Sequence, residues 1–433
     1  MAKITLFREV DQACKLPKDD KLSTLYTVLL ILPISMLIYA FLVDSPREIL
    51  EGLNHIRQAN NVLVTDYLVV GGVGAAMVNA SIIMLLNLLL LYKMQLKPNG
   101  IIISALFLLG GFAFMGKNIF NIWGFYIGGY VYSRYHNMPY KNVVVINMLS
   151  TALSPLSSLT IQSVENSFML SILLTALVTG FIGFIMPTVS SRFLQMHMGY
   201  NIYNMGVATG FVGMVIYALM RAFGLEVERN SRYLEVHHPE VTVFFVLFSV
   251  ILVIVGYILN GKTIKGYRNL LKHSGRLVTD LIKQDGFGLS LINMGLLGLM
   301  SIAYTYLVGG MLDGPAVAAV LTVMGFGAFG KHLRNTVPII VGVTLGMTIM
   351  SREVSVSVLV ISALFGTTLA PVAGQFGIMW GIIAGLLHSA VVLSIGDMHG
   401  GLVLYNNGLS GGIVATLLVP MIDAFKREKK NET

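Results

Sequence analysis

The sequence predicts an all-α integral membrane protein made of two inverted repeats, each with five to seven transmembrane helices. Three observations lead to this prediction. Only 12% of the 433 residues are charged and 55% are hydrophobic, whereas a soluble domain carries about 25% charged residues. Apolar runs near the ~20 residues needed to cross a bilayer recur along almost the whole chain. The same polar residues and glycines also return in register in the second half.

The apolar runs form two sets of seven. We expect helices in them because backbone that faces lipid must satisfy its own hydrogen bonds. A charged leader, residues 1–24, precedes the first run and lacks the pattern of a cleaved signal peptide. Its Cys14 is the single cysteine, which excludes an intrachain disulfide. The runs lie at about 25–43, 65–92, 101–115, 118–132, 143–160, 167–188 and 201–222, then at 241–260, 286–309, 315–329, 336–350, 354–372, 377–395 and 402–422.

The two sets are predicted to be copies of one unit. The pattern M-H-x-G-x-x-x-Y-N-x-G-x-x-x-G occurs at residues 196–210 and again at 398–412, with seven identities in fifteen positions. Hydrophobic composition alone does not place a His, a Tyr-Asn pair and three glycines in register. Further pairs, at offsets of 214 or 216, are Asp66 with Asp280, Asn79 with Asn293, Gly111-Phe112 with Gly325-Phe326, Gly116-Lys117 with Gly330-Lys331, and Ser154-Pro155 with Ala370-Pro371.

Lys and Arg residues set the predicted orientation, because they concentrate in cytoplasmic connections. The leader, the connection 261–284 and the tail are the most basic segments. With all three in the cytoplasm, and the chain changing side at every run, 22 of the 29 basic residues fall inside. The connection 44–64 then lies outside while its copy, 261–284, lies inside. The two units are therefore inverted, as in many transporters.

This orientation divides the chain into a cytoplasmic leader 1–24, membrane repeat 25–222, external connection 223–240, membrane repeat 241–422 with a cytoplasmic amphipathic segment 261–284, and a basic cytoplasmic tail 423–433. Residues 46–60 and 262–283 are charged and amphipathic, so we expect interfacial helices at opposite faces. The short runs within 101–132 and 315–350 have about fifteen residues each. Each pair is either two short spans or a re-entrant hairpin with Gly-Lys near its tip.

Lys117 and Lys331 are the first candidates for a functional site. They are copies of one another, and each follows a glycine between two short apolar runs. A charge inside the membrane costs ~3 kcal/mol or more unless it is compensated. We therefore expect the pair to attract an anionic group, or to change charge during transport. The alternative is that both side chains reach the lipid headgroups as topology anchors.

His197 and His399 are candidates for proton coupling, since histidine titrates near neutral pH. Asp397 lies two residues before His399, and the two would form a protonatable pair; the first copy has Gln195 at the matching position. The alternative is an ordinary interfacial histidine at the start of a run. Two histidines without further ligands do not predict a zinc site, and we expect neither a metal nor a cofactor.

The duplicated elements Tyr203-Asn204 and Tyr405-Asn406 are predicted to line the solute pathway. Asn offers both a donor and an acceptor, and the nearby glycines allow a broken or closely packed helix. The alternative is helix packing with buried Asn hydrogen bonds. Asn79 and Asn293, in the middle of runs, are further lining candidates. Asp66 and Asp280 are predicted to cap helices, and Pro155 and Pro371 to bend them.

At Tyr-Asn-x-Gly, residues 203–206 and 405–408, the chain resembles the urea transporter family, whose members are channels made of two inverted copies. They carry a Gly-Tyr-Asn-Gly element in each half, so the resemblance implies five spans and a re-entrant segment per copy. Here one extra residue separates Asn from Gly, and Lys117 and Lys331 have no counterpart. Over its full length the chain is similar to an uncharacterised family of bacterial multi-pass membrane proteins, found mostly in Firmicutes, whose function is unknown.

The predicted function is that of a permease, not an enzyme, in the plasma membrane of a bacterium. A small polar or anionic solute would cross at a midplane site between the copies, with proton coupling left open. A passive channel for a small neutral solute is the alternative within transport; a membrane-embedded enzyme using His197 or His399 is the alternative of another class. The expected partners are the solute and the lipid bilayer, not nucleic acid, and homo-oligomerisation is left open. The pathway candidates are Asn79, Lys117, Tyr203, Asn204, Asn293, Lys331, Tyr405 and Asn406; those for proton coupling are His197, Asp397 and His399.

Overall fold

The computed structural model describes residues 22–59, 61, 65–162, 168–225, 238–350 and 354–425. Most of the leader with Cys14, the basic residues of the tail and most of the connection 223–240 lie outside these ranges. Within them the secondary structure is helical, apart from one isolated β-bridge between Asp66 and Met115. In the described ranges, ten helical stretches are long and apolar enough to cross a membrane, five in each copy. The chain is an all-α, multi-pass membrane protein.

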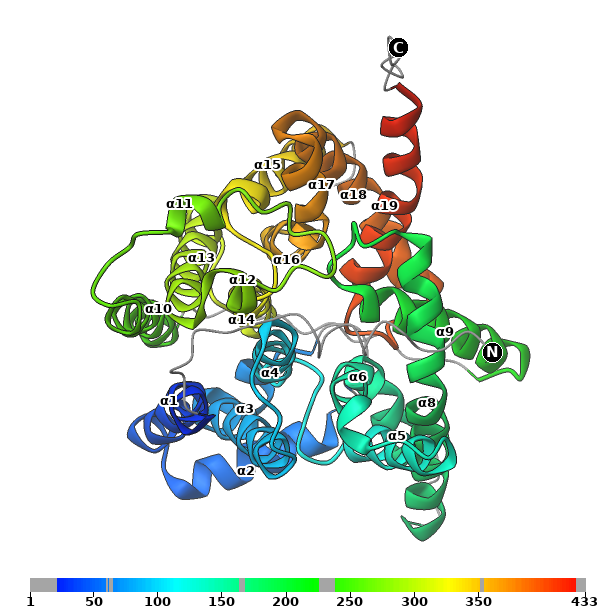
Figure 1. Cartoon of the computed structure of the whole chain (residues 1–433). Helices are drawn as coiled ribbons and strands as arrows, with labels where there is room; N and C mark the ends of the chain where they lie inside the picture. Colours follow the sequence, from blue (N-terminus) through cyan, green and yellow to red (C-terminus); the bar gives the residue numbers. More distant parts are fainter. Residues whose placement is uncertain are drawn as a thin grey trace.

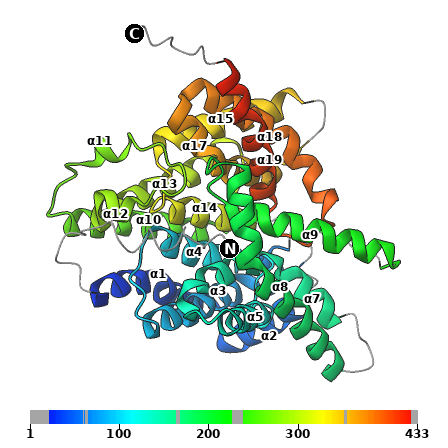
Figure 2. The same cartoon turned by 45° about the vertical axis from the view of Figure 1, so that its right-hand side comes forward.

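The two copies meet along α4 and α14. Figure 1 shows α1–α6 of the first copy in its lower half and α10–α18 of the second in its upper half, and the view in Figure 2 keeps this division. The first copy comprises α1 (Leu22–Val43), α2 (Pro46–Gln58), α3 (Tyr67–Lys93), α4 (Gly100–Phe112), α5 (Trp123–Tyr135), η2 (Tyr140–Asn142), α6 (Val144–Ser150), η3 (Thr151–Leu153), α7 (Ser154–Gln162), α8 (Phe168–Met196) and α9 (Asn204–Ala222). The second comprises α10 (Pro239–Leu259), α11 (Tyr267–Leu270), α12 (Leu281–Asp285), α13 (Phe287–Leu307), α14 (Gly314–Phe326), α15 (Leu333–Ile349), α16 (Val356–Gly366), η4 (Thr367–Leu369), α17 (Ala370–Phe376), α18 (Ile378–Met398) and α19 (Asn406–Phe425).

The short apolar helices are those of the predicted hairpins. α4, α5 and α14 have 13 residues each and α15 has 17, and none of them belongs to the ten long spans. At ~1.5 Å per residue, 13 residues cover about 20 Å, less than the ~30 Å hydrocarbon core. Each copy therefore has five long spans and one pair of short helices, the arrangement that the hairpin alternative requires.

One long span of each copy is broken at its centre. A 3₁₀ turn, η3 or η4, separates α6 from α7 and α16 from α17. Pro155 and Pro371 are the second residues after these turns, and a proline has no backbone N–H with which to continue the α-helical bonds. Their duplicated positions explain why the α-helix of both copies is interrupted at the same place, beside the two prolines that were predicted to bend it.

Equivalent helices of the two copies pack antiparallel, which shows that the copies are inverted. A Cβ added to Gly100 of α4 would lie 2.5 Å from the Ala328 oxygen, just past α14, and one added to Gly111 would lie 2.9 Å from the Ala318 oxygen near its start. Contacts thus run forward along α4 and backward along α14. A two-fold axis between such helices is perpendicular to them, so it lies in the plane of a membrane that they enter.

Two aspartates connect the copies at the ends of these central helices. Asp66 accepts hydrogen bonds from the nitrogens of Leu68 at 2.8 Å and of Gly314, in the second copy, at 3.0 Å. Asp280 accepts from Lys283 at 3.3 Å and from Gly100, in the first copy, at 3.1 Å. Each carboxylate therefore caps a helix of its own copy, as predicted, and also the central helix of the other copy.

We expect Asp66→Ala to destabilise the protein by about 2–4 kcal/mol. The change leaves two buried N–H groups without their acceptor, at about 1–3 kcal/mol each. Thermal unfolding in detergent measures the effect. Ser45→Ala is the matched control, because Ser45 caps α2 in an exposed position and its loss costs ~1 kcal/mol. Equal shifts for the two variants would contradict the role given to Asp66.

Of the two interfacial helices predicted from the sequence, the structure contains the first but not the second. α2 forms as expected, and its apolar side buries Ile49 and Ile56. The expectation of a helix over 262–283 is wrong, because this segment contains only α11, of four residues, and the start of α12. Gly261, Gly266 and Gly275 all have positive φ, a conformation that ends a right-handed helix, so the amphipathic pattern is spread over a connecting loop.

Candidate functional site

The two duplicated lysines lie at the interface of the copies, and each reaches a tyrosine of the other copy. Lys117 donates a hydrogen bond to the Tyr405 hydroxyl, and Lys331 donates to the Tyr203 hydroxyl. Lys331 also donates to Thr367, in the turn η4, at 2.6 Å. Both lysines are 0% exposed. We refer to Lys117–Tyr405 and Lys331–Tyr203 as the lysine–tyrosine pairs.

Aromatic rings surround each ammonium group. The Lys117 nitrogen lies 4.6 Å from the centre of the Tyr405 ring and 5.4 Å from that of Phe112. The Lys331 nitrogen has the equivalent rings, Tyr203 at 4.3 Å and Phe326 at 5.5 Å. A cation within about 6 Å of a ring face is attracted by the ring quadrupole. The rings partly replace the water that these side chains lose.

Among the described residues, the two lysines have no anionic partner. In the part of the chain that the structure describes, the ion pairs join other residues, and no carboxylate reaches Lys117 or Lys331. Hydroxyl groups and rings compensate a buried ammonium less completely than a carboxylate does. Their complete burial also argues against the alternative in which they reach the lipid headgroups. A desolvated lysine pair of this kind is suited to bind an anion when it is protonated.

Asn79 and Asn293 hold the loops that carry the lysines. The amide nitrogen of Asn79 donates to the backbone oxygens of Ala113 at 2.8 Å and Lys117 at 2.9 Å. Asn293 donates at 2.7 Å to the oxygens of both Gly327 and Lys331. The structure therefore places these two residues, expected to line the pathway, behind the loop, where they position Lys117 and Lys331.

A second pair of asparagines supports the same loops and was not singled out from the sequence. Asn121 donates to the Gly116 oxygen at 3.0 Å, and Asn335 donates to the Gly330 oxygen at 2.9 Å. The signal was present, since both occupy the fourth position after a duplicated lysine. Thr367 and its copy Thr151 were also missed, although they stand in register at an offset of 216.

The segments that carry Tyr203 and Tyr405 are held against the opposite copy by backbone hydrogen bonds to the 3₁₀ turn of its interrupted span. The nitrogen of Ile202, before Tyr203, donates to the Thr368 oxygen of η4 at 2.9 Å. In the other copy the nitrogen of Leu404, before Tyr405, donates to the Ala152 oxygen of η3, also at 2.9 Å. Each break frees a carbonyl that anchors the tyrosine of the opposite copy.

The asparagines that follow the two tyrosines, Asn204 and Asn406, contact histidines and not the lysines. His197 Nε2 lies 3.0 Å from Asn204 Oδ1, and His399 Nε2 lies 3.1 Å from Asn406 Oδ1. The Tyr-Asn element is thus divided, with Tyr at the lysine and Asn at the histidine. Asp397 lies in the last turn of α18 and is exposed, whereas His399 is buried. Proton coupling through His197, Asp397 and His399 stays a prediction.

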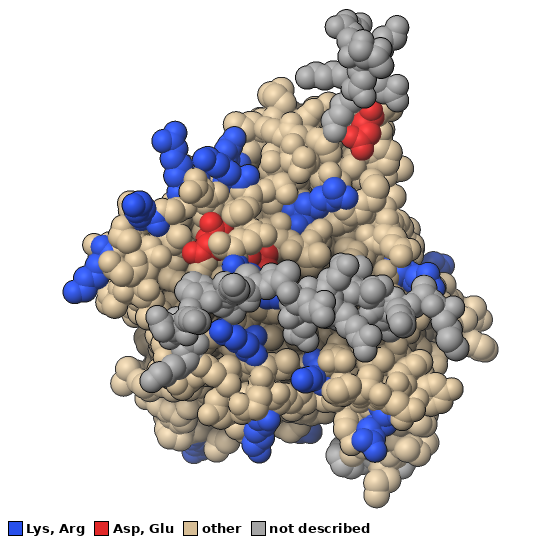
Figure 3. All heavy atoms as spheres, viewed as in Figure 1, with Lys and Arg blue, Asp and Glu red and all other residues tan. Residues whose placement is uncertain are grey.

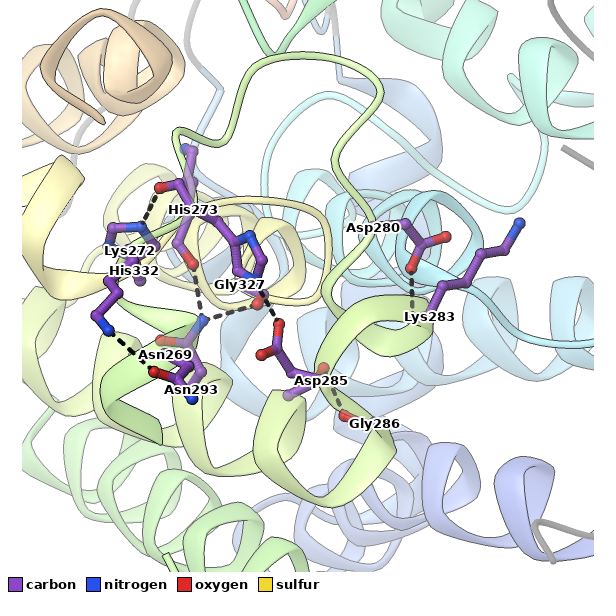
Figure 4. Close-up of polar contacts among 12 residues, drawn as sticks. Asn269, Lys272, His273, Asp280, Lys283, Asp285, Gly286, Asn293, Gly327 and His332 are labelled. Atoms are coloured by element: carbon purple, nitrogen blue, oxygen red, sulfur yellow. Dashed lines mark hydrogen bonds and ion pairs between the residues drawn. The ribbon is translucent and has the colours of Figure 1, made fainter. Parts of the chain in front are cut away.

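The loop over 261–284 covers the Lys331 loop from one side (Figure 4). His332, the residue after Lys331, contacts the His273 oxygen through Nε2 at 2.8 Å, and His273 Nε2 lies 2.8 Å from Asp285 Oδ2. Burial raises the pKa of Asp285, and the His273 imidazole opposes this shift. Among the described residues no three His, Cys, Asp or Glu side chains are grouped to hold a metal ion.

The fold and these contacts define a helical membrane protein with an internal duplication and paired buried lysines between its halves. Residues 45–222 and 250–424 each match the model of a family described as protein of unknown function (DUF1576), and the chain belongs to that family. Two matches in one chain agree with the duplication. No curated protein and no solved structure matches the chain.

Proposed function

We propose that this protein is a permease that carries a small anion between its two copies, with the lysine–tyrosine pairs as its binding groups. One observation supports this most directly, namely that Lys117 and Lys331 are fully buried with hydroxyl and ring partners and, in the described part of the chain, no carboxylate. Ionisable residues inside a membrane usually mark a transport path. A solute anion would supply the charge that the chain does not.

The two pairs form equivalent sites related by the inversion. Because Lys117 and Lys331 have no exposed surface, a solute reaches them only after a movement opens the interface. An arriving anion would take the place of the tyrosine hydroxyl on the ammonium group, and the opposite charges of donor and acceptor would strengthen that hydrogen bond. Inverted halves allow the same site to open to either side in turn.

A passive channel for a small neutral solute is the second candidate. The ring contacts of Phe112, which stacks on Phe365 with 5.3 Å between ring centres, favour a flat uncharged molecule at this interface. A channel would not saturate at low solute concentration or respond to a proton gradient. Saturable, anion-selective uptake would exclude it.

Thermal stabilisation of the purified full chain tests the proposal, because a ligand that binds the folded form raises its stability. We expect nitrate or formate to raise the unfolding temperature, and urea and glycerol to leave it unchanged. Uptake of the stabilising anion into liposomes that contain the protein should then saturate. Stabilisation by urea alone would favour the channel, and turnover of an added lipid would favour the enzyme alternative.

We further propose a bacterial plasma-membrane location with both termini in the cytoplasm. The face that carries α11 and α12 shows more Lys and Arg than Asp and Glu side chains (Figure 3). Basic residues gather on the cytoplasmic side of membrane proteins, which supports placing this face in the cytoplasm. A protease added to sealed cells should then leave the connection 261–284 intact.

A further inference from the structure

A buried histidine in the second copy takes no part in the contacts described above. His388 stands at the centre of the span α18, Ile378–Met398, and is 0% exposed. Its Nε2 lies 3.0 Å from Oδ1 of Asn407, in the first turn of α19. Its other ring nitrogen, Nδ1, is buried and has no hydrogen-bond partner among the described residues. An imidazole in the middle of a span with one unused nitrogen can accept a proton there.

The first copy has no such pair. At the offset of 202 that relates α18 to α8 and α19 to α9, the positions of His388 and Asn407 hold Met186 and Met205, which are both buried. The helix packing follows the same offset. Gly183 of α8 lies against the Phe125 oxygen, and Gly385 of α18 lies against the oxygen of Ile339, the equivalent residue of the second copy. The two copies therefore differ at two equivalent positions that touch in the second copy. The first copy has two methionines at the positions where the second copy has His388 and Asn407.

His388 is close to the lysine of its own copy. A Cβ added to Gly366 would lie 2.9 Å from the imidazole of His388. The next residue is Thr367, whose hydroxyl accepts the hydrogen bond from Lys331 at 2.6 Å. The backbone of η4 thus separates the imidazole from the Lys331–Tyr203 pair.

The charged side chains carried by α15, α18 and α19 lie several helical turns from the imidazole. Along α18 itself, Asp397 is nine residues away, or about 13 Å. On α15, Arg334 is nine residues from Val343, which packs on Gly366 beside His388, again about 13 Å. Asp423 of α19 is sixteen residues from Asn407, about 24 Å. Arg192 of α8 is exposed, and its neighbour Phe193 belongs to one hydrophobic cluster with Val391 and Ile395 of α18. α16, η4 and α17 carry no titratable residue, so Lys331 and its bound solute are the charges that His388 senses most strongly.

We propose that His388 binds a proton that is carried together with the solute anion. This rests on the proposed function. Nδ1 takes up the proton and becomes the second N–H of an imidazolium, while Nε2–H stays bonded to Asn407. An imidazolium inside the membrane is costly unless an anion is near, and an anion at Lys331 provides that charge. Proton and anion therefore favour one another's binding by the same factor, and the first copy, with Met186 and Met205 at the matching positions, lacks this proton site.

Histidine NMR of the full chain in nanodiscs tests the protonation directly. We expect one of the nine histidine ring signals, absent in His388→Met, to stay that of the neutral ring without nitrate, and nitrate to move its titration midpoint upward into the range between pH 5 and 8. A His388 signal that stays constant over this range, with and without nitrate, would overturn the proposal. A titration whose midpoint nitrate leaves unchanged would overturn the coupling.

The double variant His388→Met/Asn407→Met reproduces the pair of the first copy, so it is a well-matched test for folding. We expect nitrate to bind wild type about tenfold more tightly at pH 6 than at pH 8, and the double variant to bind equally at both. Retention of the wild-type pH dependence would contradict the role of His388. If nitrate fails to bind wild type at any pH while His388 still titrates, the proposed anion function falls and the proton site stands.

Discussion

Replacing Lys117 or Lys331 by methionine should weaken nitrate binding roughly 10- to 150-fold. Methionine keeps much of the side-chain length and removes the charge and the donor. A hydrogen bond to a charged group contributes about 1.5–3 kcal/mol, and every 1.4 kcal/mol is a factor of ten in affinity. The loss is measured by titrating the purified variants with nitrate and following the unfolding temperature.

Two further variants make this result specific. Lys265→Met removes an exposed lysine and should leave nitrate binding unchanged, which excludes a general effect of net charge. Tyr405→Phe removes the hydroxyl that Lys117 contacts and should change affinity far less than the loss of the ammonium. Unaltered binding in both lysine variants would refute the anion site.

The same lysine variants should be as stable as wild type, or more stable, without ligand. A buried charge that lacks a counterion costs free energy, and replacing it by an apolar side chain of similar volume is often neutral or stabilising. A purely structural lysine would behave in the opposite way, with a large fall in unfolding temperature. Stability and binding measured together thus separate the two roles.

Gly206→Ala should destabilise the fold by about 3 kcal/mol. α9 and α19 cross at the duplicated glycines Gly206 and Gly408. A Cβ on Gly206 would lie 2.8 Å from the Gly408 Cα, and one on Gly408 would lie 2.7 Å from the Gly206 Cα. These neighbours are backbone atoms, so relief requires the helices to move apart, and overpacking typically costs 1–3 kcal/mol or more. Thermal unfolding in detergent measures the effect.

Gly180→Ala is the matched control. Gly180 lies in the span α8 and also faces a neighbouring helix, α5. Its added Cβ would meet only the Gly124 oxygen, at 3.9 Å, which is an ordinary contact. Alanine has a higher helix propensity than glycine by about 1 kcal/mol, so this variant should be neutral or slightly more stable. If Gly206→Ala and Gly180→Ala shift the unfolding temperature equally, the close crossing of α9 and α19 is wrong.

Much of this fold is predictable because it depends on local sequence. The composition and the length of the apolar runs identify the spans, and each run needs only its own residues to form a helix in lipid. The duplication was visible in registered polar residues, and the basic residues predicted the inversion that the antiparallel α4 and α14 confirm. The Gly-Lys positions also stood out, since a charge between apolar runs is unusual.

The failures concern contacts between distant segments. The segment 262–283 has an amphipathic pattern, yet glycines with positive φ and packing against the Lys331 loop make it irregular. Tyr203 and Asn204 were treated as one element, whereas the start of α9 directs Tyr203 to Lys331 and Asn204 to His197. His388 was not considered, because a single histidine in an apolar run has no local feature that distinguishes it.

The sequence by itself determined that this protein is a duplicated, inverted bundle of membrane helices with a lysine between the two short apolar runs of each copy. Only the tertiary structure decided which group each lysine meets, namely a tyrosine of the opposite copy. Helix formation and membrane insertion follow from composition over some twenty neighbouring residues, so they can be read along the chain. The partner of a buried charge depends on how two helices cross, and that angle is set by side-chain packing between segments far apart in sequence.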